Sequence, residues 1–377
     1  RDEHLAEFDE VWLANHVGPL DASYDPQVQA AKAWIRDHGP FPRCWGTATN
    51  PYPHEALSTA QTISHGIDFL DRFGDERFFL WLSIPDPHTP LQAAEPWASM
   101  YDPDEVPLPP LRDSEIETKP TCQQIDWRAL CGDTGTEPIM RGAIAMYYGM
   151  VSAIDHEVGR FLGELDDRGL AEETIVVYMS DHGDYVGEHR MIRKSKAFYD
   201  CLTHIPLMLR WPGQLRAGQS HGDLLTIPDV MPTLLDLCEL GTPPGVQGRS
   251  FAPLLRGESY EPRDALLFEA GSAMEPVVLE DAGPFPEGPL TPDFSPKMKL
   301  GGRGLIRGIR THDHKLVRYP GGEEGELYDL SEDPWELENL WGNPNYKEVE
   351  AALTERLLDL HIETTDPLPV DLKATPD

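Results

Sequence analysis

One stretch of the sequence limits the possible folds more than any other: a long amphipathic segment that leads directly into a short apolar run. In residues 141–168, apolar side chains recur at helical spacing, and Gly169 follows in the position of a helix C-cap. Residues 174–180 (TIVVYMS) then form a largely apolar run with the length of a buried strand. A long helix followed by a buried strand predicts an α/β protein.

The same alternation continues on both sides of this unit. Residues 77–84 (RFFLWLSI) and 206–211 (PLMLRW) predict two further strands, and residues 227–240 (IPDVMPTLLDLCEL) predict a helix that ends at Gly241. The expected fold class is therefore α/β, with a mostly parallel central sheet flanked by helices.

The character of the sequence changes near residue 260. Residues 280–304 are rich in proline and glycine without any periodicity, which predicts a long ordered loop or lid. Residues 304–320 and 325–330 predict short antiparallel strands, and a closing helix is expected near residues 346–360. We predict an α/β domain over residues 1–259, incomplete at its N-terminus, and a smaller C-terminal α+β subdomain over residues 260–377.

The net charge of the chain restricts its partners. The formal charge of −34 disfavours binding to nucleic acid or to anionic lipid, because both are themselves negatively charged. An anionic substrate would need local positive charge from a metal ion or from a few lysine and arginine residues. No apolar stretch approaches the roughly 20 residues needed to span a bilayer, so we expect a soluble protein in the cytoplasm or the periplasm.

The first residues and the cysteines give weaker signals. Residues 1–12 (RDEHLAEFDEVW) lack an initiator methionine and the apolar core of a signal peptide, so the sequence is expected to begin partway through a longer protein. The five cysteines lack the short paired spacings of a zinc site, although Cys122 and Cys131 are close enough in sequence to bridge in an oxidising compartment.

Two expected strands end in side chains that can bind metals or anions. Asp181 and His182 follow residues 174–180, Gly183 lets the backbone turn there, and His88 follows residues 77–84. Ligands of open α/β sheets bind beyond the carboxyl ends of the strands, which favours one site for these residues. The alternative is that these residues have only structural roles. Asp181 would then be a turn residue, His88 a loop histidine, and Lys194 part of a solvated run of charges. Cys201 is read as a small buried apolar residue.

An aspartate with a histidine suits a divalent metal ion. Further carboxylates would favour Ca²⁺ or Mg²⁺, whereas the imidazole of His182 moves the preference toward Mn²⁺, Zn²⁺ or iron. Two ligands are too few for a complete site. Other ligands must therefore come from elsewhere.

Six blocks of the sequence resemble, in order, the successive blocks of the sulfatase family within the alkaline phosphatase superfamily, which includes arylsulfatases and phosphonate monoester hydrolases. The resemblance covers residues 61–360, and an ordered set of six is more specific than any one motif. The blocks are residues 78–91 (FFLWLSIPDPHTPL), 147–165 (YYGMVSAIDHEVGRFLGEL), 174–213 (TIVVYMSDHGDYVGEHRMIRKSKAFYDCLTHIPLMLRWPG), 227–237 (IPDVMPTLLDL), 246–257 (VQGRSFAPLLRG) and 315–340 (KLVRYPGGEEGELYDLSEDPWELENL).

The resemblance implies roles for the candidate residues. Asp181 and His182 correspond to ligands of one divalent metal ion, Ca²⁺, Mn²⁺ or Mg²⁺, and Lys194 and His88 correspond to catalytic groups that hold the sulfate or phosphate oxygens. We expect further substrate contacts from two neighbouring residues, Lys196 and His189. Many relatives carry asparagine at the position of His182, and histidine there resembles the branch that includes phosphonate monoester hydrolases.

The resemblance also implies a nucleophile that this sequence does not contain. In the family, a cysteine or serine in a Cys/Ser-x-Pro/Ala-x-Arg motif is oxidised to formylglycine, whose hydrate attacks sulfur or phosphorus. None of the five cysteines has that context. We therefore expect the nucleophile, together with paired aspartates that complete the metal site, in an N-terminal segment of the same protein outside this sequence.

Three functions follow as alternatives. The first is a metal-dependent hydrolase of small-molecule or saccharide sulfate esters, and the second is a phosphonate monoester or phosphodiester hydrolase. The third is a non-catalytic scaffold. Substrate choice would depend on loop walls, expected at residues 95–136 and 281–303. Without the nucleophile segment, residues 1–377 are expected to be inactive alone. An oligomer is compatible with the sequence.

Overall fold

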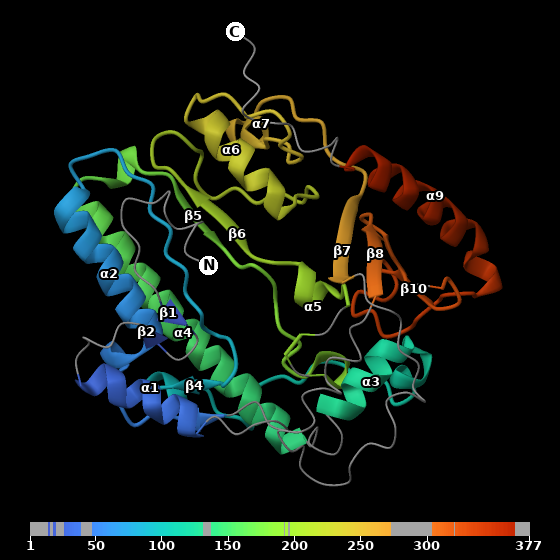
Figure 1. The fold of residues 1–377 in the computed structure, drawn as a ribbon, viewed down its shortest axis with the longest axis horizontal. Helices are drawn as coiled ribbons and strands as arrows, with labels where there is room; N and C mark the ends of the chain where they lie inside the picture. Colours follow the sequence, from blue (N-terminus) through green and yellow to red (C-terminus); the bar gives the residue numbers. More distant parts are fainter. Residues whose placement is uncertain are drawn as a thin grey trace.

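The structure of the chain is a computed structural model that describes residues 14–15, 18–19, 26–38, 47–130, 137–191, 193–194, 197–272, 304–319 and 321–365. It combines a helical side, a central two-stranded sheet and a four-stranded sheet on the opposite side (Figure 1). Among these residues, no helix is long and apolar enough to cross a membrane.

The helical side consists of α1 (Pro26–His38), α2 (Ser58–Phe73) and α4 (Glu137–Asp167). Helices α2 and α4 pack against each other (Figure 1). Helix α4 buries Ala143, Ile144 and Met150, which recur at helical spacing. Gly169 has a φ of +71°, and the backbone N–H of Leu170 bonds to the carbonyl of Leu165 at 2.9 Å, as expected where a helix ends. The predicted helix and its glycine end are confirmed.

The central sheet differs from the prediction in the direction of its strands. β5 (Val176–Met179) and β6 (Leu207–Arg210) confirm two predicted strands, but they pair antiparallel, with Val176 opposite Arg210. Two separate sheets each consist of two strands of two residues: β3 (Ala48–Thr49) lies parallel to β4 (Gln92–Ala93), and β1 (Ala14–Asn15) lies antiparallel to β2 (Gly18–Pro19). A mostly parallel central sheet is not confirmed for the described residues.

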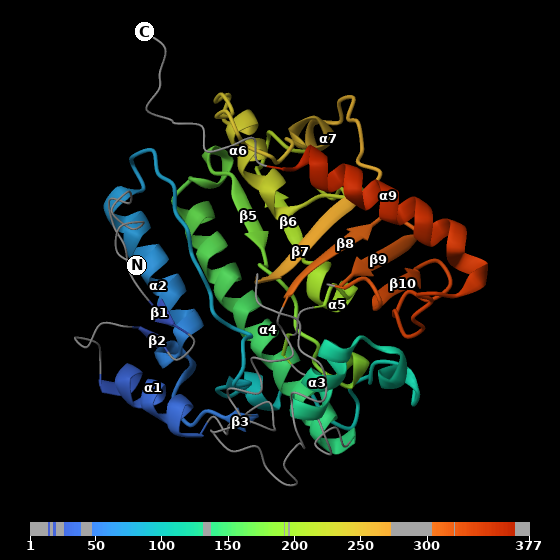
Figure 2. The same ribbon diagram turned by 45° about the vertical axis from the view of Figure 1, so that its right-hand side comes forward.

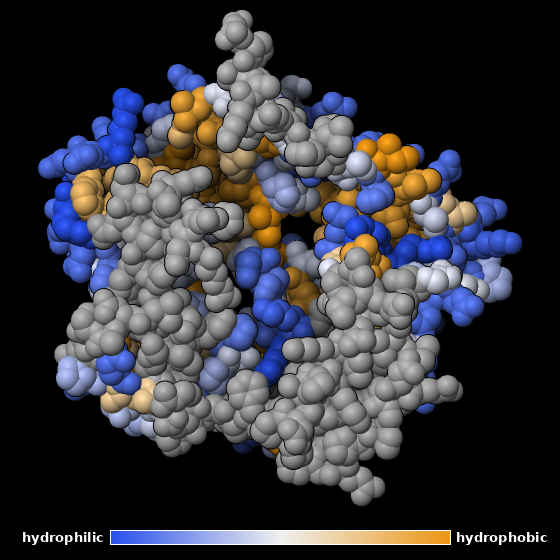
Figure 3. Space-filling view, in the orientation of Figure 1, coloured by the Kyte–Doolittle hydropathy of each residue, from blue (hydrophilic) through white to orange (hydrophobic). Residues whose placement is uncertain are grey.

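The predicted strand over residues 77–84 was wrong. Its side chains alternate between exposed and half-buried, which is the period of an extended chain, and Phe79 and Trp81 are 63% and 72% exposed. A strand also needs a hydrogen-bonded neighbour, and none of the described strands pairs with this segment. Figure 3 shows further hydrophobic surface over the region of β6 and α6 (Val230–Leu237), where Met208 and Met231 are exposed.

Short helices connect the two sides of the molecule. α5 (Asp200–Thr203) precedes β6, α3 (Thr121–Leu130) precedes α4, and α7 (Ala252–Arg256) follows α6. The predicted helix over residues 227–240 is divided into a 3-10 turn, Ile227–Asp229, and α6. Helix α6 stops before Gly241 because Glu239 has a φ of +58°, and the N–H of Leu240 bonds to the carbonyl of Leu235 at 2.7 Å, as at a helix C-terminus.

The C-terminal part confirms the predicted α+β unit. β7 (Leu266–Ser272), β8 (Gly304–Arg310), β9 (His314–Arg318) and β10 (Gly325–Asp329) form an antiparallel sheet in the order β10-β9-β8-β7. α9 (Lys347–Glu363) packs on this sheet through Leu353, Leu357 and Leu360 (Figure 2). Residues 281–303, predicted as a loop wall, lie outside the described residues, and the division at residue 260 stays a prediction.

A continuous core joins the two parts. Met140 and Ile144 of α4 lie in one buried cluster with Tyr185 and Tyr199, which follow β5, and with Tyr328 of β10. The segment between β5 and α5 is therefore enclosed between the long helix and the C-terminal sheet. This enclosure positions the candidate site.

Candidate active site

The chain makes a tight turn directly after β5. The hydroxyl of Ser180 donates to the carbonyl of His182 at 2.7 Å, and the backbone N–H of His182 donates to Oδ1 of Asp181 at 2.8 Å. The next residue, Gly183, donates its N–H to the carbonyl of Leu202 in α5 at 2.9 Å. These bonds hold the two predicted metal ligands at the end of the strand.

Three predicted site residues come together at this turn. Nε2 of His182 lies 2.7 Å from Nζ of Lys194 and 3.5 Å from Oδ2 of Asp181. Because Nδ1–H donates to the carbonyl of Gly183 at 2.7 Å, Nε2 carries the lone pair that accepts from the lysine ammonium. The side chains of Asp181 and His182 are 84% and 38% exposed, so the group faces solvent.

This arrangement fits a divalent metal ion. The ring of His182 is held by the bond from its Nδ1, as in metal sites where the other nitrogen is the ligand. The Nε2 atom and Oδ2 of Asp181 are 3.5 Å apart, which allows both to approach one cation with little movement. The Lys194 ammonium donates to the same lone pair, so an ion bound at Nε2 would displace it from that nitrogen. Asp181 and His182 thus stay the predicted ligands of the ion.

A further carboxylate behind the turn was missed by sequence analysis. Asp184 accepts from the backbone N–H of Val186 at 3.2 Å, and burial raises its pKa, although the backbone N–H groups of Val186 and Arg193 and the charge of Lys194 lower it in part. Burial of the carboxyl thus disfavours its charged form. Its place two residues after His182 was the signal available in the sequence.

His88 and Lys196 are two other predicted site residues. Two of the contacts of His88 are with its own loop: its Nδ1 lies 2.6 Å from the carbonyl of Thr89, and its N–H bonds to the carbonyl of Pro85. Its convergence with Asp181 stays a prediction. Lys196 lies outside the described residues.

His189 does not lie at the exposed turn. It is 5% exposed, its Nδ1 lies 2.5 Å from Oε1 of Glu115, and its ring stacks on Tyr199 at 3.7 Å. Such burial leaves little surface for a substrate. The side chain belongs to a buried polar network, and its expected role as a substrate contact stays a prediction.

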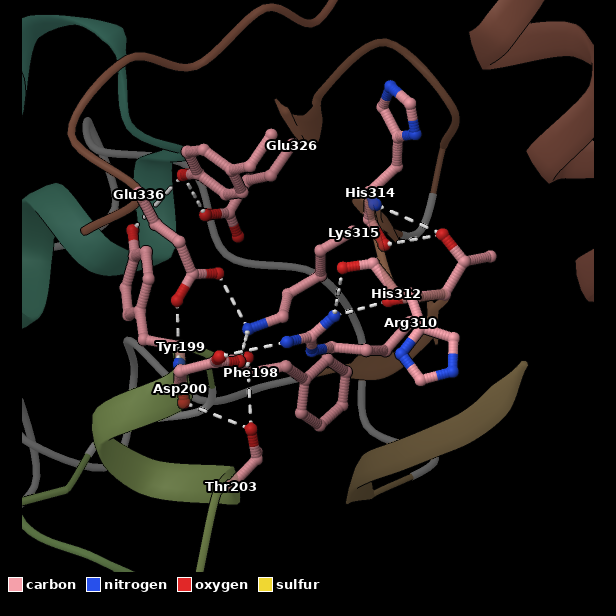
Figure 4. Close-up of polar contacts among 12 residues, drawn as sticks. Phe198, Tyr199, Asp200, Thr203, Arg310, His312, His314, Lys315, Glu326 and Glu336 are labelled. Carbon is pink, nitrogen blue, oxygen red and sulfur yellow. Dashed lines mark hydrogen bonds and ion pairs between the residues drawn. The ribbon is translucent and has the colours of Figure 1, made fainter. Parts of the chain in front are cut away.

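A second buried network supports the turn from the C-terminal sheet. Asp200, at the start of α5, accepts from Lys315 of β9 at 2.6 Å and from Arg310 of β8 at 3.2 Å (Figure 4). Glu336 accepts the backbone N–H of Asp200 at 2.6 Å and lies 2.6 Å from Nζ of Lys315. Since α5 also holds Gly183, the C-terminal sheet fixes the orientation of the candidate site.

Comparison with models of known protein families identifies the family of this chain. Residues 14–240, more than half of the 377, match the model of the sulfatase family. The chain belongs to the sulfatase family. Residues 304–363 also match the C-terminal model named for N-sulphoglucosamine sulphohydrolase, which covers β8 to α9. The family membership predicted from the six sequence blocks is confirmed.

Several proteins are similar to this sulfatase-family chain. An arylsulfatase from Clostridium perfringens is 29% identical over 310 residues, covering 81% of this chain and 57% of the relative. A Δ4,5-hexuronate-2-O-sulfatase from Bacteroides thetaiotaomicron is 33% identical over 224 residues, covering 59% of this chain and 41% of the relative. The chain thus spans about half the length of these relatives.

The solved structures agree on the fold. The phosphonate monoester hydrolase from Silicibacter pomeroyi superimposes with a TM-score of 0.75 at 24% identity, covering 93% of this chain and 71% of the neighbour. This likeness confirms the alkaline phosphatase-like α/β fold of the sulfatase-family chain.

Proposed function

We propose that this chain carries the metal-binding and charge-stabilising part of an active site that hydrolyses sulfate esters. The observation that carries the proposal is the exposed group of Asp181, His182 and Lys194 at the end of β5. In a protein of net charge −34, a lysine ammonium joined to two metal-type ligands gives a local site for an anion. Membership of the sulfatase family supports the same reaction.

Different residues would bind the metal ion and stabilise charge on the substrate. A divalent ion held by Asp181 and His182 would supply Lewis-acid stabilisation of the ester oxygens. The Lys194 ammonium, 2.7 Å from the imidazole, would donate to the peripheral oxygens as negative charge grows on them. His88 would donate a hydrogen bond or a proton near the leaving oxygen. A formylglycine-type nucleophile outside this sequence is part of the proposal, because none of the five cysteines has the required motif.

The proposed substrates are sulfated saccharides or small aryl sulfates. Relatives named as saccharide sulfatases and as an arylsulfatase support these two classes. The second candidate is a phosphonate monoester or phosphodiester hydrolase. It is favoured by histidine at position 182, together with the fold shared with phosphonate monoester hydrolases.

The test uses the complete protein that contains these residues. We expect it to hydrolyse 4-nitrophenyl sulfate, and Lys194→Ala to lower kcat/KM by about 100-fold or more, as for the loss of one charge-stabilising donor. Lys347→Ala, at an exposed lysine at the start of α9, is the matched control and should leave kcat/KM unchanged. A faster reaction with 4-nitrophenyl phenylphosphonate would favour the second candidate.

Metal content provides an independent check. Asp181→Ala removes an anionic ligand and should abolish tight binding of a divalent ion, measured by elemental analysis after dialysis. Unchanged metal content would contradict the ligand assignment. A metal-loaded complete protein that hydrolyses neither ester would favour the scaffold alternative.

A further inference from the structure

A buried group of three metal-binding side chains lies behind the candidate active site. One carboxylate oxygen of Glu188, one ring nitrogen of His189 and Sγ of Cys201 all lie within 4.8 Å of one another. Glu188 and His189 belong to the loop after β5, and Cys201 belongs to α5. We propose that these residues bind a thiophilic divalent cation, best Zn²⁺, which ties this loop to α5.

The histidine is already oriented as a metal-binding histidine would be. Its Nδ1 donates to Oε1 of Glu115 at 2.5 Å, and Lys119 holds the same oxygen at 3.1 Å. A carboxylate behind the ring fixes the tautomer and leaves Nε2 as the nitrogen that can bind a cation. Stacking on Tyr199 at 3.7 Å fixes the plane of the ring. The orientation thus comes from residues distant in sequence.

The donor set suits zinc. Thiolate, imidazole and carboxylate are the three kinds of protein ligand that Zn²⁺ takes, and tetrahedral bonds to them separate the donor atoms by roughly 3.3–3.8 Å. The present separations, all within 4.8 Å, need a shift of about an ångström, with water as a fourth ligand. On binding, the S–H bond of Cys201 breaks, the sulfur keeps the electron pair as it binds the ion, and the proton passes to solvent.

The local charges favour a cation here. Burial raises the pKa of the Cys201 thiol well above its usual range, and the carboxylates of Glu188 and Glu336 raise it further. Burial also raises the pKa of Glu188, and burial lowers the pKa of His189 despite its bond to Glu115. The carboxylates that face the thiol attract a cation, and the Lys315 ammonium opposes them.

The backbone gives a reason for a cross-link. Val186, His189, Arg190 and Arg193 all have φ between +40° and +62°, a region that L-residues rarely adopt. Such backbone persists only where the surroundings hold it. A cation joining Glu188 and His189 to Cys201 would hold this loop at the point where Gly183 bonds to α5. It would act as a support for the turn that carries Asp181 and His182.

The test separates this cation from one at Asp181 and His182. The metal-free complete protein is titrated with Co²⁺, and a thiolate-to-cobalt charge-transfer band is followed in the near ultraviolet. Asp181 and His182 supply no sulfur, so loss of the band in Cys201→Ser identifies the proposed site, and this readout does not depend on sulfatase activity. We expect the band to reach its maximum at one Co²⁺ ion per chain. It should be lost in Cys201→Ser and retained in Cys122→Ser, the control at another half-buried free thiol.

A conservative variant makes the result independent of folding. Glu115→Gln should keep the band but weaken Co²⁺ affinity by about 10–100-fold, because it removes the carboxylate behind the imidazole. Zn²⁺ should displace Co²⁺, which removes the band, and should raise the Tm of the wild type more than that of Cys201→Ser. The absence of a band in the wild type would overturn the proposal. So would a band that survives in Cys201→Ser.

Discussion

Gly183 lies where the turn after β5 meets α5, and its missing side chain allows that contact. A Cβ atom at this position would lie 1.9 Å from the carbonyl oxygen of Cys201, and the backbone N–H of Gly183 bonds to the carbonyl of Leu202. The obstructing atom is backbone, so a rotamer change cannot relieve the contact. The position of Asp181 and His182 relative to α5 therefore depends on this glycine.

We expect Gly183→Ala to lower the free energy of unfolding by about 1–3 kcal/mol, the usual effect of overpacking. The measurement is urea denaturation. Gly159→Ala is the matched control: it lies exposed in α4 with nothing within 4 Å of the added Cβ, and alanine should stabilise the helix by about 0.5–1 kcal/mol. Shifts of the same sign in both variants would show that the contact with Cys201 is not the cause.

The proximity of site residues was predictable where the signal is local. Asp181, His182 and Lys194 lie within fourteen positions of one another, and a strand followed by a glycine turn was enough to bring them together. The burial of His189 was not visible because its partner Glu115 is 74 residues away. Cys201 was read as an apolar residue, since nothing in its neighbourhood in sequence reveals the contact with Glu188 and His189.

At the scale of elements, α5 is too short to be stable by itself and is held by long-range ion pairs. Asp200 meets Lys315 and Arg310 of the C-terminal sheet, and Glu336 accepts its backbone N–H. Lys315 is fully buried, so its ammonium depends on these two carboxylates for compensation. Protonation within this network should therefore change the stability of the support beneath the site.

Glu336 gives this network a pH dependence. Burial raises its pKa from 4.5 to about 7, the charge of Asp200 raises it as well, and Lys315 opposes the shift. The native state then holds more protons than the unfolded state between these values, so stability is lost as the pH rises from about 4.5 to about 7. A shift of this size corresponds to about 3 kcal/mol.

Glu336→Gln should make the unfolding free energy less dependent on pH across this interval, measured by urea denaturation at several pH values. Comparison with the wild type cancels the pH dependence that the two proteins share. Glu338→Gln is the control, because the side chain of Glu338 is 58% exposed in the same loop and should leave the profile unchanged. An unchanged profile in Glu336→Gln would mean that another group titrates.

Strand prediction shows what an isolated segment cannot reveal. The antiparallel β8, β9 and β10 were predicted correctly, since each pairs with a neighbour close in sequence. Residues 77–84 have the composition of a buried strand but no described partner, and β5 pairs with β6 in the direction opposite to the one expected. Apolar composition predicts an extended chain, whereas pairing and direction are decided by neighbours distant in sequence.

At the scale of the whole molecule, charge is the dominant property. If every lysine and arginine were paired with one carboxylate, 34 carboxylates would remain, because the chain has 65 acidic and 31 basic residues. Exposed ion pairs such as Arg112–Glu338 and Arg256–Asp236 contribute about 0–1 kcal/mol each, and salt weakens them. Salt also weakens the repulsion among the excess carboxylates, which acts against the compact state. Salt thus has two opposite effects on stability. Because acidic groups are in excess, the weakening of their repulsion is expected to be the larger effect.

We therefore expect the Tm of the protein to rise between about 0.1 M and about 1 M NaCl, where the Debye length falls from about 10 Å to about 3 Å. A chelator in all samples removes divalent cations, so that only screening changes.

The combined variant Glu348→Gln, Glu355→Gln and Asp359→Asn removes three exposed charges from α9 and should reduce the salt dependence of the Tm. Lys347→Gln, in the same helix, adds to the net negative charge and should increase it. These opposite changes distinguish screening of net charge from a general salting-out effect, which would raise the Tm of all the variants alike. A Tm that falls with salt would mean that the ion pairs, including those of Lys315 and Asp200, outweigh the net repulsion.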